Sequence, residues 1–272
     1  LDVFPDEPQV NPTLLTCPNL VLTPHLGAST QEAQSGAALQ AAQQVVDVLA
    51  GRQARNPVNI TALTSEEMAF LQPYLDLAGR MGRFYAQYVH NNLTHLEITF
   101  AGDVAAHHTQ LIIAAALVGL LSESGDEVVN LVNAPLLAAE RGLKISEVRT
   151  PDAQGFTGLV TLAARTTAHD CLLSGTVMRN QPHLVRIGDY WLDFVLQGHL
   201  LVSQHIEQPG IIGQMGLLLG SAGISISFVQ VGRQARGGPG LMVTGLDDPL
   251  PPEVLAQVMT VPSIQTAWYV RL

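Results

Sequence analysis

His25 is the residue of this sequence best suited to transferring a proton. It stands between Pro24 and a Leu-Gly-Ala-Ser-Thr turn, directly before an expected helix. An imidazole titrates near neutral pH, and a ring placed just before a helix can be held in a fixed direction. Gly27 lets a ligand approach the backbone closely, because it has no side chain. These features predict a general acid or base, although a single histidine is more often a surface or core residue.

A second group of polar residues, near the C-terminus, could hold a small zwitterion. His205 and Glu207 project from the same side of an expected strand, directly before the turn Gln208-Pro209-Gly210. This turn opens a helix whose N-terminus attracts a carboxylate, and Glu207 could bind an ammonium group. The alternative is that Glu207 only complements the helix dipole while His205 is solvated.

Positive charge in the middle of the chain is concentrated at Arg179, His183 and Arg186, on or beside expected strands. These side chains could bind a phosphate or a carboxylate. The alternative is a solvated strand edge, because charged side chains also protect exposed edges from pairing.

Other kinds of site are not indicated. Cys17 and Cys171 lie far apart, and the histidines show no metal-ligand spacing, so we expect neither a disulfide nor a metal. The sequence also lacks the glycine-rich motifs of dinucleotide and phosphate-loop sites and the Gly-x-Ser-x-Gly motif of hydrolases. The residues alone therefore do not assemble a complete active site.

The composition describes a folded, acidic protein. The chain has 272 residues, 47% of them hydrophobic and 13% charged, with a formal net charge of −10. This length predicts two domains or one large one, and the composition excludes disorder. Sparse Lys and Arg argue against nucleic acid and anionic membranes as partners. The longest apolar run, 111–121, is too short to span a bilayer, so we expect a soluble, cytoplasmic protein.

The first fifty residues suggest the end of something longer, because the chain starts at Leu1 with Asp-Val-Phe-Pro rather than methionine. Residues 20–22 predict a short buried strand. Ser29 and Glu32 have the spacing of a capping box, which predicts a helix from there to Gly51. The polar stretch around Asn56-Pro57 predicts a domain boundary at 55/56.

The middle of the chain predicts a helical layer on a sheet. Helices are expected at 65–89, at 103–122 with Asp103 as cap, and in a short segment that ends at Gly142. The second of these should be buried, because it is apolar nearly all round. Besides a strand at 93–101, we expect antiparallel strands at 144–149, 157–167, 171–179 and 183–195, with a hairpin turn at 167–170.

The final seventy residues have the βαββαβ order of a ferredoxin-like split sheet. The expected strands are 200–207, 224–231, 241–246 and 263–272, and the expected helices are 209–222, with Pro209 in its first turn, and 251–259. The strand 224–231 should lie at a sheet edge, which invites pairing with a second copy.

Three segments of the sequence carry a family resemblance. Residues 1–8, Leu-Asp-Val-Phe-Pro-Asp-Glu-Pro, and 22–34, Leu-Thr-Pro-His-Leu-Gly-Ala-Ser-Thr-Gln-Glu-Ala-Gln, closely resemble the end of the catalytic core of the D-3-phosphoglycerate dehydrogenase family. Residues 131–142 are similar to the intervening, allosteric substrate-binding domain of the long form of this family. Residues 208–226 are similar to an ACT domain, which in this family can bind L-serine.

The resemblance implies an α+β architecture in three parts. Residues 1–55 would be the remnant of a Rossmann-type α/β core, and 56–198 an intervening domain with an antiparallel sheet and packed helices. Residues 199–272 would be a ferredoxin-like ACT regulatory domain.

The resemblance also implies an activity, the NAD-dependent oxidation of 3-phosphoglycerate to 3-phosphohydroxypyruvate in L-serine biosynthesis. His25 would be the general acid/base, with Asp2, Gly27 and Ala28 near the nicotinamide. The partner Glu, the carboxylate-binding Arg and the Rossmann glycines would lie upstream of Leu1. We therefore expect this chain by itself to be inactive.

The implied effector site consists of His205, Glu207, Gly210 and Ser225, in a homo-oligomer joined through the ACT domain. Two of these residues depart from the family pattern. Family members usually have Asn or Asp where this chain has Glu207, and Asn where it has Ser225. L-serine feedback is therefore a hypothesis. Two other functions stay open: a non-catalytic amino-acid-binding regulatory module in which His25 is vestigial, and a reductase of another small 2-hydroxy or 2-oxo acid.

Overall fold

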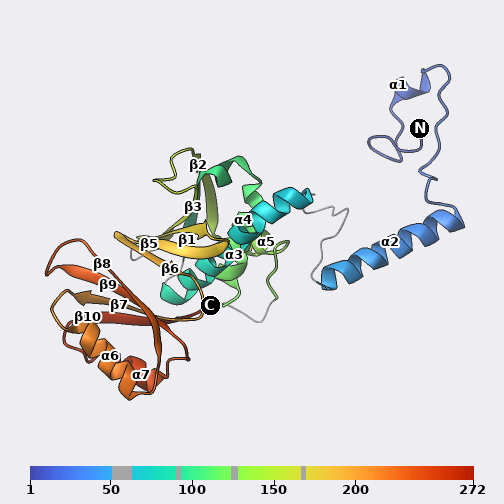
Figure 1. Ribbon diagram of the computed structural model, residues 1–272. Helices are drawn as coiled ribbons and strands as arrows, with labels where there is room; N and C mark the ends of the chain where they lie inside the picture. The colour runs from blue at the N-terminus through green and yellow to red at the C-terminus, as the bar shows by residue number, and fades with distance from the viewer. Residues whose placement is uncertain (51–62, 90–92, 124–127, 167–169) are drawn as a thin grey trace. The chain divides into compact units, whose positions relative to one another are not determined.

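The computed structural model describes residues 1–50, 63–89, 93–123, 128–166 and 170–272. The chain divides into two compact units, Leu1–Ala62 and Leu63–Leu272 (Figure 1). The boundary expected at 55/56 lies outside the described residues, as do the expected helix stop at Gly51 and most of the turn at 167–170.

The first unit contains the short helix α1 (Pro12–Leu15) and the long helix α2 (Gln31–Leu49). The strand expected at 20–22 is wrong, because Val21 is 75% exposed and its backbone bonds only to the start of the chain. The Leu1 amino group donates to the Val21 carbonyl, and the Thr23 amide donates to the Leu1 carbonyl. The described residues of this unit contain no strand, so a Rossmann-type remnant is not seen in them.

Helix α2 begins one residue later than its capping pattern predicts. The cap is Thr30, whose hydroxyl accepts a hydrogen bond from the Ala33 amide at 3.2 Å. Ser29 instead belongs to the preceding turn, since its amide donates to the Leu26 carbonyl. The predicted capping box is therefore corrected. Much of the apolar surface of α2 is exposed, including Leu39, Val46 and Leu49.

The first part of the second unit contains a six-stranded sheet. Its strands are β1 (Leu93–Gly102), β2 (Lys144–Thr150), β3 (Gly158–Thr166), β4 (Asp170–Met178), β5 (Gln181–Ile187) and β6 (Tyr190–Val195). They lie in the order β2-β1-β3-β4-β5-β6. The expected antiparallel sheet is corrected to a mixed one, because β2 runs parallel to β1. A long helical crossover separates these two strands, which is the connection that parallel pairing needs.

The segment 183–195 is a hairpin rather than the single strand expected. Strands β5 and β6 are antiparallel and meet at a turn that contains Gly188, whose φ is +56°. This left-handed conformation favours glycine. The hairpin brings Tyr190 and Trp191 back beside Ile187 and Arg186, respectively.

Helices α3 (Ser65–Tyr88), α4 (Thr109–Leu121) and α5 (Ala134–Glu140) accompany this sheet. The predicted helix 103–122 is divided, because Asp103–Ala106 forms a 3-10 turn and the backbone is extended at His107. The residue at the cap position of this turn is Gly102 rather than Asp103. The prediction that this helix is buried is confirmed for α4, which packs against α3. The short helix α5 ends before Gly142 as predicted, where φ is +75°.

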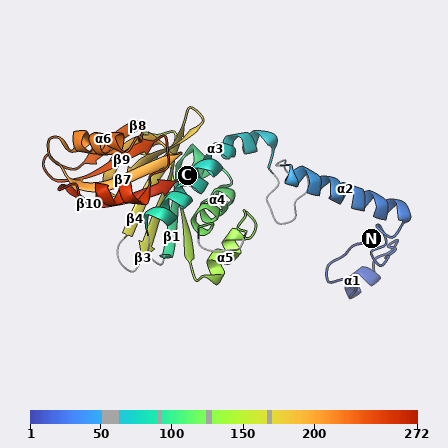
Figure 2. The same cartoon turned by 90° about the horizontal axis from the view of Figure 1, so that it is seen from below.

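The remaining residues confirm the βαββαβ order. Strands β7 (His199–Ile206), β8 (Ile226–Arg233), β9 (Pro239–Leu246) and β10 (Ile264–Arg271) form an antiparallel sheet in the order β10-β7-β9-β8. Helices α6 (Ile211–Ser221) and α7 (Pro252–Val258) lie side by side on one face of this sheet (Figure 1), and Figure 2 shows α6 beside the strands from below. Pro209 is not in the first turn of α6 as expected; it precedes the cap, Gly210.

The two sheets of this unit pack together. Leu201 faces the core under α6 and α7, whereas Leu200 and Val202 face the core shared with α3 and the six-stranded sheet. The end of α3 is tied to β10 by two bonds between the Gln87 side chain and the Arg271 backbone, of 2.9 and 2.8 Å. Among the described helices, none is long and apolar enough to cross a membrane.

Candidate functional site

The loop that carries His25 is closed by the carboxylate of Asp2. This carboxylate accepts hydrogen bonds from the Thr23 hydroxyl at 2.6 Å and from the amides of Leu26 at 2.7 Å and Gly27 at 2.6 Å. These bonds, the Thr23 one foremost, lower the pKa of Asp2. The His25 amide also donates to the Asp2 carbonyl. The loop can therefore hold His25 at a positive φ of 54°.

His25 is paired with Glu7, a residue that sequence reasoning missed. Its Nδ1 lies 2.7 Å from Glu7 Oε2, and Glu7 Oε1 accepts a bond from the Phe4 amide at 2.8 Å. The hydrogen bond to Glu7 raises the pKa of His25, while the bonds from Phe4 and His25 lower the pKa of Glu7. The expectation that the carboxylate partner lies upstream of Leu1 is thus corrected. Glu7 and His25 are separated by 18 positions in the sequence, which gives no spacing signal, so only the fold reveals this pair.

The pair borders a hollow of about 250 Å³ with largely apolar walls, lined by Phe4, Pro8, Val10, Leu22 and Pro24. The His25 side chain is 59% exposed. With Nδ1 engaged by Glu7, Nε2 remains to exchange a proton with a bound molecule. This arrangement can perform general acid/base chemistry.

Two of the three residues expected near a nicotinamide, Asp2 and Gly27, stabilise the loop itself. Asp2 accepts three bonds there, and a side chain at Gly27 would come within 3.0 Å of the Asp2 carboxylate. A side chain at Gly27 would therefore crowd the carboxylate that closes the loop. Ala28 is exposed beside Gly27. Asp2 and Gly27 therefore stabilise the loop, whereas Ala28 makes no such contact. The three residues can border a nicotinamide, but they do not by themselves form a dinucleotide site.

Three of the four expected effector residues lie at one end of the four-stranded sheet. His205 is fully buried, with Nε2 3.5 Å from Glu207 Oε2, and Gly210 caps α6 with a φ of +93°. Arg233, which sequence reasoning missed, donates from Nη1 to Glu207 Oε1 at 3.2 Å. The strand register explains this meeting, because His205 and Arg233 both pair with Gly240.

Ser225 does not join them. It directly precedes Ile226, which pairs with Leu246, and Leu246 pairs with His199 at the other end of β7. Ser225 is therefore separated from Glu207 by the length of the strands in this chain. Within one chain, Ser225 and Glu207 therefore do not share a site.

The expected anion site does not assemble either. His183 is bound to Asp193, with 2.7 Å between Nδ1 and Oδ1. Arg186 donates to the Gly188 carbonyl and lies over the Trp191 ring, 5.3 Å from its centroid. Arg179 occupies the exposed turn beyond β4. These residues mainly organise the β4–β5–β6 region.

Comparison with known proteins agrees with the family resemblance. A family model described as "D-3-phosphoglycerate dehydrogenase intervening domain" matches residues 70–188. D-3-phosphoglycerate dehydrogenase of Synechocystis is 37% identical over 274 residues, covering 100% of this chain and 50% of the relative. The Methanocaldococcus jannaschii enzyme is 35% identical, covering 100% and 52%, and the Bacillus subtilis enzyme 33%, covering 97% and 50%.

The chain thus spans about half the length of the curated relatives it matches. The match to the intervening domain covers α3 to β5, the region of the six-stranded sheet. The chain is therefore homologous to the C-terminal half of the D-3-phosphoglycerate dehydrogenases and contains their intervening domain.

Proposed function

We propose that this chain belongs to an NAD-dependent enzyme that oxidises 3-phosphoglycerate to 3-phosphohydroxypyruvate in L-serine biosynthesis. The observation that carries the proposal is the 2.7 Å contact between His25 and Glu7, beside a hollow that can admit a small molecule. The relatives that match the whole chain are D-3-phosphoglycerate dehydrogenases, which supports the choice of substrate. The enzyme would be cytoplasmic.

In the proposed mechanism, His25 acts as the base in the oxidation of the alcohol. Its Nδ1–H donates to Glu7, so the lone pair on Nε2 can take the hydroxyl proton of the substrate. Glu7 fixes the tautomer and stabilises the imidazolium that forms. NAD, held mainly by residues outside this chain, would supply the acceptor for the hydride that leaves the same carbon. In the reverse direction, His25 returns the proton.

We also propose three parts: a catalytic-core segment at 1–55, the intervening domain at 56–198 and an ACT domain at 199–272. In the ACT domain, His205, Glu207 and Gly210 would bind L-serine together with Arg233, which contacts Glu207. Glu207 and Arg233 form an ion pair that a zwitterion could enter, its ammonium toward Glu207 and its carboxylate toward Arg233. Strand β8 at the sheet edge would join copies into a homo-oligomer.

The test of the catalytic proposal uses the protein encoded by the complete reading frame. We expect NAD reduction with 3-phosphoglycerate, abolished by His25→Gln, whereas the 272-residue chain alone gives none. A complete protein with a dinucleotide-binding motif but no reduction of NAD by this substrate would overturn the proposal. A preference for another small 2-hydroxy acid would overturn the substrate assignment.

A further inference from the structure

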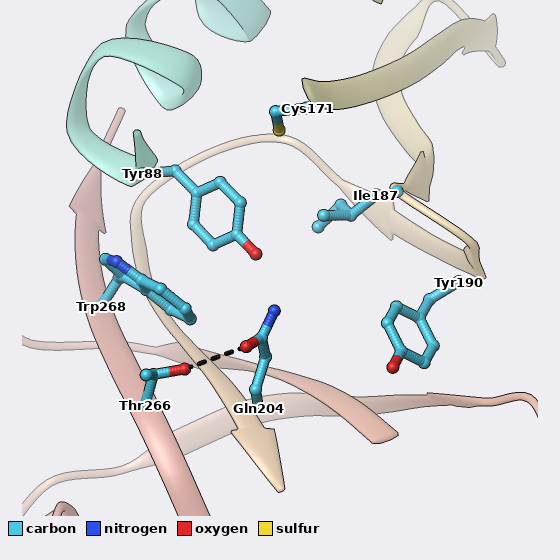
Figure 3. Close-up of a pocket in the computed structure, with 8 residues that line it drawn as sticks. Tyr88, Cys171, Ile187, Tyr190, Gln204, Thr266 and Trp268 are labelled. Carbon is cyan, nitrogen blue, oxygen red and sulfur yellow. Dashed lines mark hydrogen bonds between the residues drawn. The ribbon is translucent and has the colours of Figure 1, made fainter. Parts of the chain in front are cut away.

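A cavity of about 440 Å³ lies where the two sheets of the second unit meet (Figure 3). Tyr88 at the end of α3 and Tyr190 of β6 border it from one domain, and Gln204, Thr266 and Trp268 from β7 and β10. Cavities of this size hold small organic molecules. None of these residues belongs to a site predicted from the sequence.

The walls of this cavity are uncharged. Among the described residues that line it, none has a side chain that is charged at neutral pH. Burial raises the pKa of the Cys171 thiol to about 12 and also raises the pKa of Tyr88, so both groups stay neutral. Transferring an ion into such surroundings without a partner is costly. The residues that line the cavity therefore offer no charged partner to a phosphate ester or an amino acid.

Aromatic rings give the cavity its shape. Tyr88 and Trp268 lie together, with 4.7 Å between ring centroids and 58° between ring planes. Figure 3 shows Tyr190 across the cavity from them. Aromatic side chains on facing walls favour a flat ring, which can stack on one wall and meet the other by its edge.

Polar groups on one wall provide a direction for hydrogen bonding. The Thr266 hydroxyl donates to Gln204 Oε1 at 3.1 Å, which leaves Gln204 Nε2 turned toward the Tyr88 oxygen (Figure 3). Burial is the main cause of the raised pKa of Tyr88, and the nearby Gln204 amide acts in the opposite direction, as a donor to the Tyr88 oxygen would. The phenolic hydrogen and the second amide hydrogen can then both reach an acceptor in the cavity.

We propose that this cavity binds an uncharged, planar ring compound that carries a carbonyl or amide oxygen. The ring would lie among Tyr88, Tyr190 and Trp268, and its oxygen would accept from Tyr88 and Gln204. Because Gln204 and His205 are neighbours on β7, their side chains project from opposite faces of the sheet. The site is therefore separate from the group around Glu207, and a ligand in it would contact both sheets at once.

The probe for this site is benzamide, which has a flat ring, a carbonyl oxygen and no charge. Isothermal titration of the 272-residue chain should show saturable binding with a Kd of ~1 mM, a typical value for so small a ligand. Two matched compounds test the chemistry. Benzoate has the same shape but a charge, and cyclohexanecarboxamide has the same amide but no flat ring. Both should bind at least about fivefold more weakly.

Three variants locate the binding. Tyr88→Phe and Gln204→Leu each remove a donor, and each should weaken benzamide binding about five- to tenfold. Gln257→Leu makes the same chemical change on the exposed surface of α7 and should leave binding unchanged. Thermal unfolding of each variant shows whether it is folded. If the Gln204→Leu variant is unfolded, the Tyr88→Phe variant alone tests the site, because this substitution removes only one oxygen atom.

The proposal fails if 10 mM benzamide produces no saturable heat. It also fails if benzoate binds equally well, or if a folded Tyr88→Phe variant binds benzamide as the parent chain does. Binding that is weakened by Tyr88→Phe and unaffected by Gln257→Leu supports it.

Discussion

His25 Nδ1 and Glu7 Oε2 lie 2.7 Å apart, in a segment where each residue is also held by the backbone around it. Glu7 is fixed by the Phe4 amide, and His25 by the loop that Asp2 closes. The pair is exposed at the surface of this unit, so solvent screens it. The contact therefore mainly orients the imidazole ring: Nδ1 faces the Glu7 carboxylate, and Nε2 is left to contact a substrate.

Glu7→Gln should move the pKa of His25 down toward the ordinary value of 6.5, because the charged partner is lost. In the parent chain, the pair stabilises the folded state at pH values between the lowered pKa of Glu7 and the raised pKa of His25. The His25 contribution is lost as pH rises through its raised pKa, and the Glu7 contribution as pH falls through its lowered pKa. An NMR titration of the imidazole protons measures the change. Glu32→Gln, an exposed carboxylate on α2, is the control, and equal midpoints in both variants would contradict the assignment.

Asp2→Asn should loosen the loop before α2, because the amide cannot accept all the bonds that the carboxylate accepts. We expect faster hydrogen exchange at the amides of Leu26 and Gly27, measured by NMR or mass spectrometry. The parent chain should show the same loosening at low pH, as pH falls through the lowered pKa of Asp2. Asp6→Asn, at an exposed position, serves for comparison. Unchanged exchange in Asp2→Asn would show that the backbone alone holds the loop.

Gly82→Ala should destabilise the second unit by more than about 2 kcal/mol. A side chain at Gly82 would overlap the Ala116 carbonyl on α4, and one at Gly119 would overlap the Gly79 carbonyl on α3. The helices can approach this closely only because neither glycine has a Cβ atom. Gly216→Ala on α6 is the control, since nothing lies within 4 Å of the added atom. Denaturant unfolding of the chain measures both, and equal stabilities would refute the close approach.

Glu207→Gln and Arg233→Gln should each weaken L-serine binding about tenfold, because each removes one charged partner of the zwitterion. Isothermal titration measures this, with D-serine and glycine as comparison ligands. Glu253→Gln, on α7, should bind as the parent does. If the parent chain gives no heat with millimolar L-serine, the effector proposal is wrong while the catalytic one stands.

Cys17 should react with a thiol reagent at pH 8 and Cys171 should not. Cys17 is exposed, whereas Cys171 is buried and burial raises its pKa to about 12, so little thiolate forms. The native chain is therefore expected to yield one reactive thiol with Ellman's reagent and the unfolded chain two. Rapid reaction of both in the native chain would mean that the region around β4 opens readily.

The sequence alone determined the local elements of the second unit. Helix α3, the βαββαβ order and the buried helix α4 follow from periodicity, since each pattern is read within a short segment. The same holds for the position of His25 before a helix, and the motifs around it pointed to the family. Helix caps and helix breaks were predicted less reliably from the sequence. The cap of α2 is Thr30 rather than Ser29, and the helix expected from Asp103 is divided into a 3-10 turn and α4.

Tertiary structure decided the partnerships. No pattern within a segment indicates that Glu7 reaches His25, that Arg233 meets Glu207, or that Ser225 lies at the far end of the same sheet. The parallel pairing of β2 also depends on where a long crossover returns the chain. These contacts join residues that are distant in sequence, so they arise from strand register and loop closure, which local residue preferences do not specify.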